Sequence, residues 1–171
     1  MNLPERFEAL IITLSDRAYR GEYQDLSGPS IKEKLSEFFA FHKWDSTISS
    51  ILIPDDAGIL QEKIREAREH TDFIFTTGGT GIGPRDITVD AVKPLLAKEI
   101  PGIMEFIRIK YGAEKPNALL SRGVAGITGK SLIYTLPGSL RAVDEYMTEI
   151  LKTLKHTVLM QYGVDSHHKH Q

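Results

Sequence analysis

Residues 73–90 read FIFTTGGTGIGPRDITVD, and this stretch decides the fold. Its first five residues form a short apolar run, which predicts a buried strand that ends at Gly78 and Gly79. Four glycines then stand within six positions, at 78, 79, 81 and 83. Glycine permits positive φ angles and leaves the backbone uncovered, so successive N–H groups can point into one anion-binding concavity.

The polar side chains of this stretch also suit the binding of an anion such as phosphate. Arg85 offers a fork of donors that suits phosphate or carboxylate, and the acids Asp86 and Asp90 follow it. Hydroxyl donors come from three threonines: Thr76, Thr77 and Thr80. Backbone donors, a guanidinium and acids together favour a Mg²⁺-bound nucleotide over a bare anion. The alternative is a flexible glycine turn with a solvated Arg-Asp pair.

Two common nucleotide-binding templates do not fit the chain. A dinucleotide fingerprint that begins at Gly79 needs glycine at position 84, which is Pro84. The sequence GKS at residues 129–131 imitates the end of a P-loop, but the first glycine of that motif would have to replace Val124. Residues 76–90 therefore predict a phosphate-binding loop of another kind.

Outward from this loop, apolar runs alternate with helical periodicities. Strands are expected at residues 7–14, 46–53, 73–77, 123–127 and 131–136, the last two joined by a glycine turn. Helices are expected from residue 28, after the possible caps Asp55 and Asp56, after a cap at Asp90, at about 102–111 and at about 140–160. Alternating helices and uniformly apolar strands predict a three-layer α/β/α fold with a mostly parallel central sheet.

Ligands of such sheets bind beyond the carboxyl ends of the strands. Polar segments occupy that position at residues 15–28, 53–56, 76–90 and 137–139, and we expect them to converge on one cleft. Asp16 and Asp55 could each face a ligand or serve only the local structure, and Asp25 is expected in a solvated loop. Residues 137–139 are either a turn or a helix start whose N–H groups hold a phosphate.

Composition narrows the class of protein. The 171 residues, 41% hydrophobic and 26% charged, predict one domain over 1–171 with a core at about 7–162 and a flexible tail at 163–171. A net charge of -2 argues against a nucleic-acid partner, and the lack of cysteine excludes disulfides and thiolate metal sites. No apolar run reaches the roughly 18 residues that a membrane span needs, so we expect a cytoplasmic protein. The ending HHKHQ at 167–171 is either a metal binder or a polar terminus.

Five segments together resemble the molybdopterin adenylyltransferases of molybdenum cofactor biosynthesis (the MogA/MoaB family), which are related to the gephyrin G domain. They are LSDRAYRGEYQDLSG at 14–28, IPD at 53–55, TTGGTGIGPRDITVD at 76–90, LSR at 120–122 and LPGS at 136–139. The resemblance implies a compact three-layer fold that is usually a homotrimer. It also implies that the terminal phosphate of molybdopterin attacks the α-phosphorus of Mg²⁺-ATP, giving adenylyl-molybdopterin and pyrophosphate.

The resemblance also implies roles for single residues. Asp55 and Asp86 match acidic positions used in catalysis and would hold Mg²⁺. The substrate and nucleotide pocket would be formed by Ser15, Asp16, Thr77, Gly78, Gly79, Thr80, Gly81, Arg85, Asp90, Ser121, Arg122, Gly138 and Ser139.

The chain departs from the family pattern at two positions. Val89 stands where relatives often have proline, and Arg141 stands near a position where they often have lysine. A molybdopterin-binding carrier or scaffold that performs no chemistry is the alternative function, and the presence of both Asp55 and Asp86 favours the enzyme. A protein that inserts molybdenum is a possible partner.

Overall fold

Six strands form one sheet in the order β2-β1-β3-β6-β5-β4. In the computed structural model, which describes residues 2–164, they are β1 (Arg6–Leu14), β2 (Asp45–Ile53), β3 (Phe73–Thr77), β4 (Lys98–Glu99), β5 (Ala125–Thr128) and β6 (Ser131–Leu136). β1 pairs in parallel with β2 and β3, and β3 pairs in parallel with β6. The pairs β5·β6 and β4·β5 are antiparallel. The prediction of a mostly parallel sheet is confirmed.

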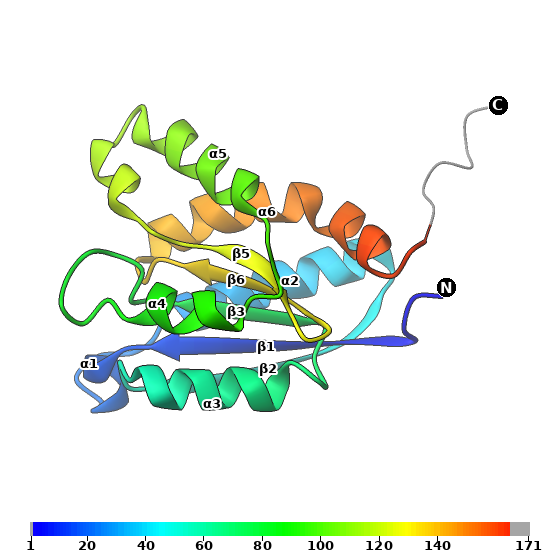
Figure 1. Cartoon of the computed structure of the whole chain (residues 1–171), viewed down its shortest axis with the longest axis horizontal. Coiled ribbons are helices and arrows are strands. Elements are labelled where there is room, and N and C mark those ends of the chain that lie inside the picture. The colour runs from blue at the N-terminus through cyan, green and yellow to red at the C-terminus, as the bar shows by residue number, and fades with distance from the viewer. Residues whose placement is uncertain (1, 165–171) are drawn as a thin grey trace.

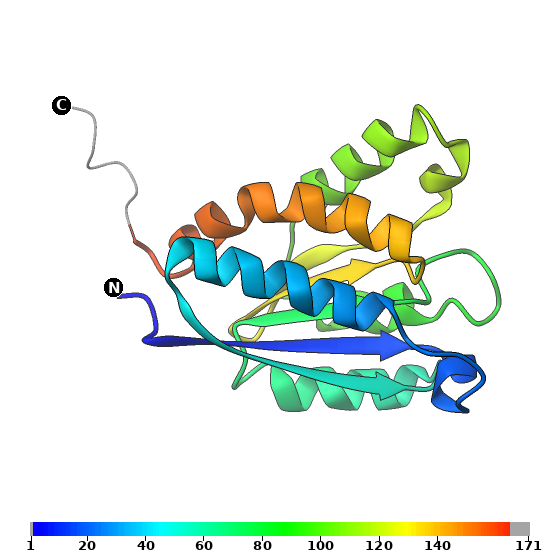
Figure 2. The same ribbon diagram turned by 180° about the vertical axis from the view of Figure 1, so that it is seen from behind.

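Helices cover both faces of this sheet. They are α1 (Asp16–Tyr19), α2 (Ser27–His42), α3 (Ala57–Ala67), α4 (Thr88–Val92), α5 (Pro101–Gly112) and α6 (Leu140–Gln161), with 3-10 turns at Lys93–Leu95 and Pro116–Leu120. α3 and α4 lie on one face, and α2 and α6 lie on the other, with α5 beside α6 (Figures 1 and 2). The predicted three-layer α/β/α architecture is confirmed.

β1 shows why the middle of its sequence, from Ala9 to Ile12, is uniformly apolar. Alternate side chains of a strand point to opposite faces of the sheet. Phe7, Ala9 and Ile11 pack into the core under α2 and α6, whereas Leu10 and Ile12 pack into the core under α3 and α4. The buried middle of a central strand with helices on both sides therefore needs apolar residues at successive positions.

Three details of local structure differ from the prediction. α4 begins at Thr88, so Asp90 lies in its first turn and is not its cap. Asp25 is not merely solvated, because its carboxylate accepts hydrogen bonds from the Thr13 hydroxyl (2.7 Å) and from the first backbone N–H groups of α2. Asp25 thus joins the end of β1 to the start of α2, and the segment expected to be only a loop also contains α1.

The two ends of the sheet carry different parts of the chain. The carboxyl ends of β1, β2, β3 and β6 lie at the left in Figure 1 with α1 and the long loop after β3, and the described terminal segments lie at the right. No helix within residues 2–164 is long and apolar enough to cross a membrane. The HHKHQ ending at 167–171 lies outside the described residues.

Candidate active site

The loops that follow four parallel strands meet at one edge of the sheet. Register places Leu14 beside Ile53, and Thr77 beside Leu136. The Ser15 N–H donates to the Ile53 carbonyl (3.1 Å), and the Gly78 N–H donates to the Leu136 carbonyl (3.0 Å). The expected convergence of these loops is therefore confirmed.

The start of the loop after β3 requires glycine. Gly78 has φ +103°, and a Cβ there would lie 2.3 Å from the Leu14 carbonyl oxygen. Gly79 has φ +66°, and a Cβ there would lie 2.5 Å from Thr88 Oγ1. Thr88 closes the base of the loop, because its hydroxyl donates to the Gly78 carbonyl (2.8 Å) and its N–H to the Gly79 carbonyl (3.0 Å).

Asp16 and Asp55 hold the ends of β1 and β2 together by a reciprocal pair of hydrogen bonds. The Asp55 N–H donates to Asp16 Oδ1 (3.0 Å), and the Asp16 N–H donates to Asp55 Oδ2 (3.1 Å). Asp56, not Asp55, caps α3, since its carboxylate accepts from the Ile59 N–H (2.8 Å). The capping alternative for Asp55 is thereby settled, and its carboxylate lines the cleft.

Asp86 turns back into its own loop. Its Oδ2 accepts from the Gly83 N–H (2.7 Å), and its own N–H donates to the Gly83 carbonyl (3.0 Å). A Cβ at Gly81 or Gly83 would lie 2.7 Å or 3.0 Å from Asp86 Oδ2. Gly81 and Gly83 therefore make room for a carboxylate, whereas Gly78 and Gly79 are required by the positive φ angles of the turn.

Two cavities adjoin at Asp86. The first, here called the acidic cavity, has a volume of about 430 Å³ and is lined by Asp16, Asp55 and Asp86 among other residues. The second, here called the wide cavity, has a volume of about 520 Å³ and extends over the start of α6. Gly79, Gly83 and Asp86 line both cavities. A group beside Asp86 can therefore reach either one.

The wall of the wide cavity contains side chains that sequence analysis missed. Glu145 Oε1 accepts from Arg141 Nε (3.2 Å) and from the Lys115 ammonium. Burial raises the pKa of Tyr146, and its protonated hydroxyl donates to Ser121 Oγ (2.9 Å). In the sequence, the spacing of four residues between Arg141 and Glu145 is the one signal that could have pointed to this group.

The structure distributes the predicted site residues over these cavities. The acidic cavity takes Ser15, Asp16, Asp55, Gly79, Arg85 and Asp86. The wide cavity takes Gly79, Thr80, Gly81, Asp86, Ser121, Gly138 and Ser139. Thr77 is fully buried, and its hydroxyl donates to the Pro137 carbonyl (2.9 Å), so it joins two loops. Gly78 likewise lies beneath the cleft.

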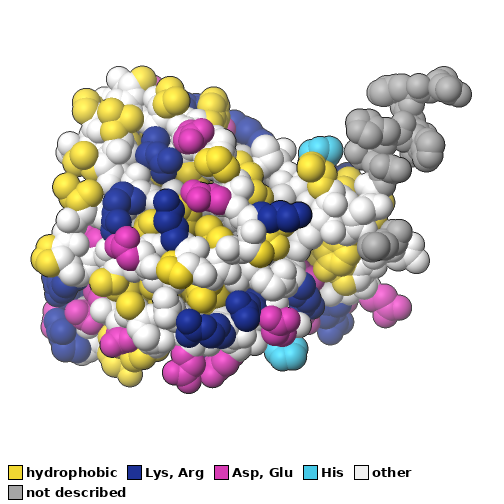
Figure 3. All heavy atoms as spheres, viewed as in Figure 1, with side chains coloured by type: hydrophobic (Ala, Val, Ile, Leu, Met, Phe, Trp, Pro, Cys, Tyr) yellow, Lys and Arg dark blue, Asp and Glu magenta, His cyan; other side chains and the backbone are white. Residues whose placement is uncertain are grey.

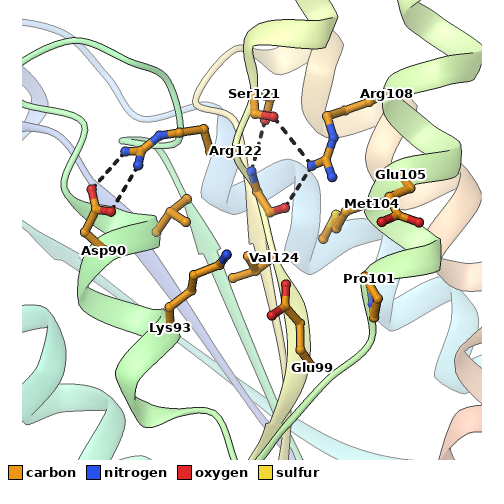
Figure 4. Close-up of a pocket in the computed structure, with 12 residues that line it drawn as sticks. Asp90, Lys93, Glu99, Pro101, Met104, Glu105, Arg108, Ser121, Arg122 and Val124 are labelled. Carbon is orange, nitrogen blue, oxygen red and sulfur yellow. Dashed lines mark hydrogen bonds and ion pairs between the residues drawn. The ribbon is translucent and has the colours of Figure 1, made fainter.

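Asp90 and Arg122 lie on the other side of the loop. They line a third cavity of about 470 Å³ between α4 and α5 (Figure 4). The side-chain hydrogen bonds of Arg122 hold the pKa of the Asp90 carboxyl below its usual range. Figure 3, which looks onto this side of the molecule, shows basic side chains with acidic ones among them over the region between α4 and α5. The structure thus separates these two residues from the rest of the predicted set.

The acids of the cleft suit a metal ion that substrate oxygens help to bind. Across residues 2–164, no three His, Asp or Glu side chains stand close enough to hold a metal by themselves. Mg²⁺ commonly binds one or two carboxylates together with substrate phosphates and water. Asp55 and Asp86, which line one cavity, fit that kind of site.

Comparison with known proteins gives a consistent result. Residues 10–156 match the family model described as "Probable molybdopterin binding domain". The chain is 37% identical over 150 residues to the molybdenum cofactor synthesis protein cinnamon of Drosophila melanogaster, covering 86% of this chain but only 24% of that protein. It is 36% identical over 159 residues to a molybdopterin adenylyltransferase of Helicobacter pylori, covering 90% of this chain and 86% of that one.

A solved structure supports the same assignment. The crystal structure of a molybdopterin biosynthesis protein from Mycobacterium abscessus superimposes with a TM-score of 0.82 at 32% identity, covering 92% of this chain and 98% of that one. The resemblance found in five sequence segments is therefore confirmed. The chain belongs to the molybdopterin-binding domain family of molybdenum cofactor biosynthesis.

Proposed function

We propose that this protein is a molybdopterin adenylyltransferase. It transfers AMP from Mg²⁺-ATP to the terminal phosphate of molybdopterin, giving adenylyl-molybdopterin and pyrophosphate. The observation that carries the proposal is the position of Asp86 at the junction of two cavities, each of a size for one substrate. The Helicobacter pylori relative of that name, which matches this chain over most of its length, supports it.

The two cavities suit different substrates. The acidic cavity, with its three aspartates, takes the metal-bound phosphates of ATP. The wide cavity has a mainly apolar lining that includes Tyr146, and it takes the pterin. At its edge Ser139 caps α6, and the positive end of that helix, with Arg141 nearby, favours the phosphate of molybdopterin.

The reaction needs positioning and charge neutralisation more than covalent participation of the protein. An oxygen of the molybdopterin phosphate forms a bond to the α-phosphorus of ATP, and the bond from that phosphorus to the pyrophosphate oxygen breaks. Mg²⁺, when bound, neutralises the phosphate oxygens. Asp55 and Asp86 would hold the metal, and the backbone of the glycine loop would face the reacting phosphates.

Other properties belong to the same proposal. Residues 1–171 act as one domain with a core at about 7–162, the protein assembles as a homotrimer, and it works in the cytoplasm. A separate protein inserts molybdenum into the product. The homotrimer is inferred from the family resemblance alone.

The direct test supplies purified protein with molybdopterin and Mg²⁺-ATP and follows adenylyl-molybdopterin and pyrophosphate by chromatography. Equal amounts of both products are expected, and none without Mg²⁺. Tight pterin binding by folded protein without any product would support the carrier alternative and refute the enzyme.

A further inference from the structure

The tip of the glycine loop takes its hydrogen bonds to the rest of the described chain from one neighbouring segment. Within the part of the chain that the structure describes, residues 80–86 make hydrogen bonds to other segments only through Ser121 and Arg122. The remaining hydrogen bonds of these residues, such as that from the Gly83 N–H to Asp86, stay inside the loop. Arg85 Nη1 also lies 3.7 Å from Asp16 Oδ2, which is beyond hydrogen-bond distance. The placement of Asp86 between the two cavities therefore depends mainly on the segment of Ser121 and Arg122.

Arg122 supplies most of these bonds. Its backbone N–H donates to the Thr80 carbonyl (2.8 Å), and its Nε donates to the Gly81 carbonyl (2.8 Å). Its Nη2 donates to the Asp86 carbonyl (3.0 Å). One side chain thus contacts the loop before and after the turn that carries Gly83.

Asp90 fixes the orientation of the Arg122 guanidinium. Nη1 donates to Asp90 Oδ1 (3.0 Å), and Nη2 donates to Asp90 Oδ2 (2.9 Å), which is the parallel fork that an arginine and a carboxylate form best (Figure 4). Asp90 lies in the first turn of α4, a helix that packs on the sheet. The fork between Arg122 and Asp90 therefore connects the loop tip to that helix.

The number of donors argues against direct substrate binding by Arg122. A guanidinium carries five N–H donors, and four bonds from this one already go to Gly81, Asp86 and Asp90. Its side chain lines the third cavity and is absent from the lining of the acidic and wide cavities. A ligand in the cleft would have to displace bonds that hold the loop.

We infer that Arg122, oriented by Asp90, is a positioning residue that clamps residues 80–86 and thereby places Asp86 for adenylyl transfer. The expected change in kcat rests on the proposed function, whereas the expected change in loop stability does not. In this inference Arg122 and Asp90 hold the loop in place, whereas the sequence led us to expect that they contact the ligand.

Arg122→Lys tests the clamp, because lysine keeps the charge but cannot form the fork. Without substrate, hydrogen exchange at the protected amides of Gly83, Asp86 and Thr88 should accelerate about tenfold or more. In the transfer assay, kcat should fall about tenfold to a hundredfold while KM for both substrates changes less than about threefold. Asp90→Asn, which keeps the size of the side chain, should shift both readouts in the same direction by a smaller factor.

Arg6→Lys is the matched control. Arg6 also pairs with an aspartate, because its Nε and Nη2 both lie 2.8 Å from Asp45 Oδ2 where β1 and β2 begin, far from the loop. This variant should leave exchange at residues 80–88 and kcat unchanged.

The outcomes separate the inference from the proposed function. If Arg122→Lys raises KM while kcat and exchange stay at wild-type values, Arg122 is a ligand contact and the inference is wrong. If the wild type transfers no adenylyl group, the proposed function fails, and exchange in the substrate-free protein decides the inference alone. Unchanged exchange in both Arg122→Lys and Asp90→Asn would then overturn it.

Discussion

The two ends of the sheet surround their acidic side chains in opposite ways. Just before β3, Asp72 is 4% exposed, and its carboxylate accepts from the Glu8 N–H (2.8 Å) and the Tyr162 hydroxyl (2.5 Å), with Lys130 Nζ at 3.8 Å. At the carboxyl ends, Asp55 and Asp86 are half-buried, and each accepts one hydrogen bond from a backbone N–H. A carboxylate whose two oxygens are both occupied stabilises the fold, whereas one with an unoccupied oxygen beside a cavity is available to a ligand.

Asp86→Asn gives the largest expected effect and tests the carboxyl-end half of this comparison. The amide oxygen of asparagine can still accept from the Gly83 N–H, but the charge between the two cavities is lost. We expect kcat for adenylyl transfer to fall by about 10²–10³-fold, with little change in the free energy of unfolding. Asp144→Asn, on the exposed side of α6, is the control. Wild-type kcat in Asp86→Asn would remove Asp86 from the reaction.

Asp72→Ala tests the role of the buried acid at the end of the sheet opposite the cleft. It leaves the Glu8 N–H and the Tyr162 hydroxyl without their acceptor in a buried site. The free energy of unfolding, measured with urea, should fall by about 3 kcal/mol. Turnover per folded molecule should stay at the wild-type level. A loss of turnover with wild-type stability would show that acids at the two ends do not differ in role.

Gly78→Ala tests whether the cleft depends on backbone geometry as well as charge. Alanine would have to adopt φ +103° with its Cβ 2.3 Å from the Leu14 carbonyl oxygen. We expect a loss of about 2 kcal/mol in the free energy of unfolding. Gly102→Ala is the matched control, because a Cβ at that position of α5 meets nothing within 4 Å. Equal stability of the two variants would contradict this account of the loop.

Glu149 extends the comparison to pH. Burial opposes its ionisation, but hydrogen bonds from Lys110, Lys152 and Tyr111 outweigh burial and lower the pKa of Glu149 to about 2 from 4.5. Because the folded pKa lies below the unfolded one, the stabilisation is complete above pH 4.5 and is lost as pH falls toward 2. The stability difference between wild type and Glu149→Gln in urea should therefore shrink over that window. A difference independent of pH would show that the charge does not contribute.

The sequence predicted the main strands and long helices because their apolar patterns follow directly from burial. β1 is apolar from Ala9 to Ile12, β3 is apolar from Phe73 to Phe75, and α6 repeats its buried residues at helical spacing. β4 could not be predicted, since its two residues, Lys98 and Glu99, are both exposed and are held by pairing with β5. Such a strand is determined by tertiary contact.

In the candidate site, too, some features could be predicted from the sequence and others depend on tertiary contacts. The loop after β3 and the positions of Asp55 and Asp86 follow from motif and strand order. The grouping of Lys115 with Glu145 arises when the segment after α5 packs beside α6, and no local pattern records that contact. The sequence also could not distinguish a ligand contact from a clamp at Arg122, because the difference depends on which acceptors its donors meet.

A crystal structure of the protein with adenylyl-molybdopterin bound would show directly whether Asp86 lies between the two substrate sites. We expect the pterin in the wide cavity, the adenylyl group extending into the acidic cavity, and the linking phosphates next to Asp86. Density for the product in the third cavity beside Asp90, or with both halves remote from Asp86, would contradict this expectation.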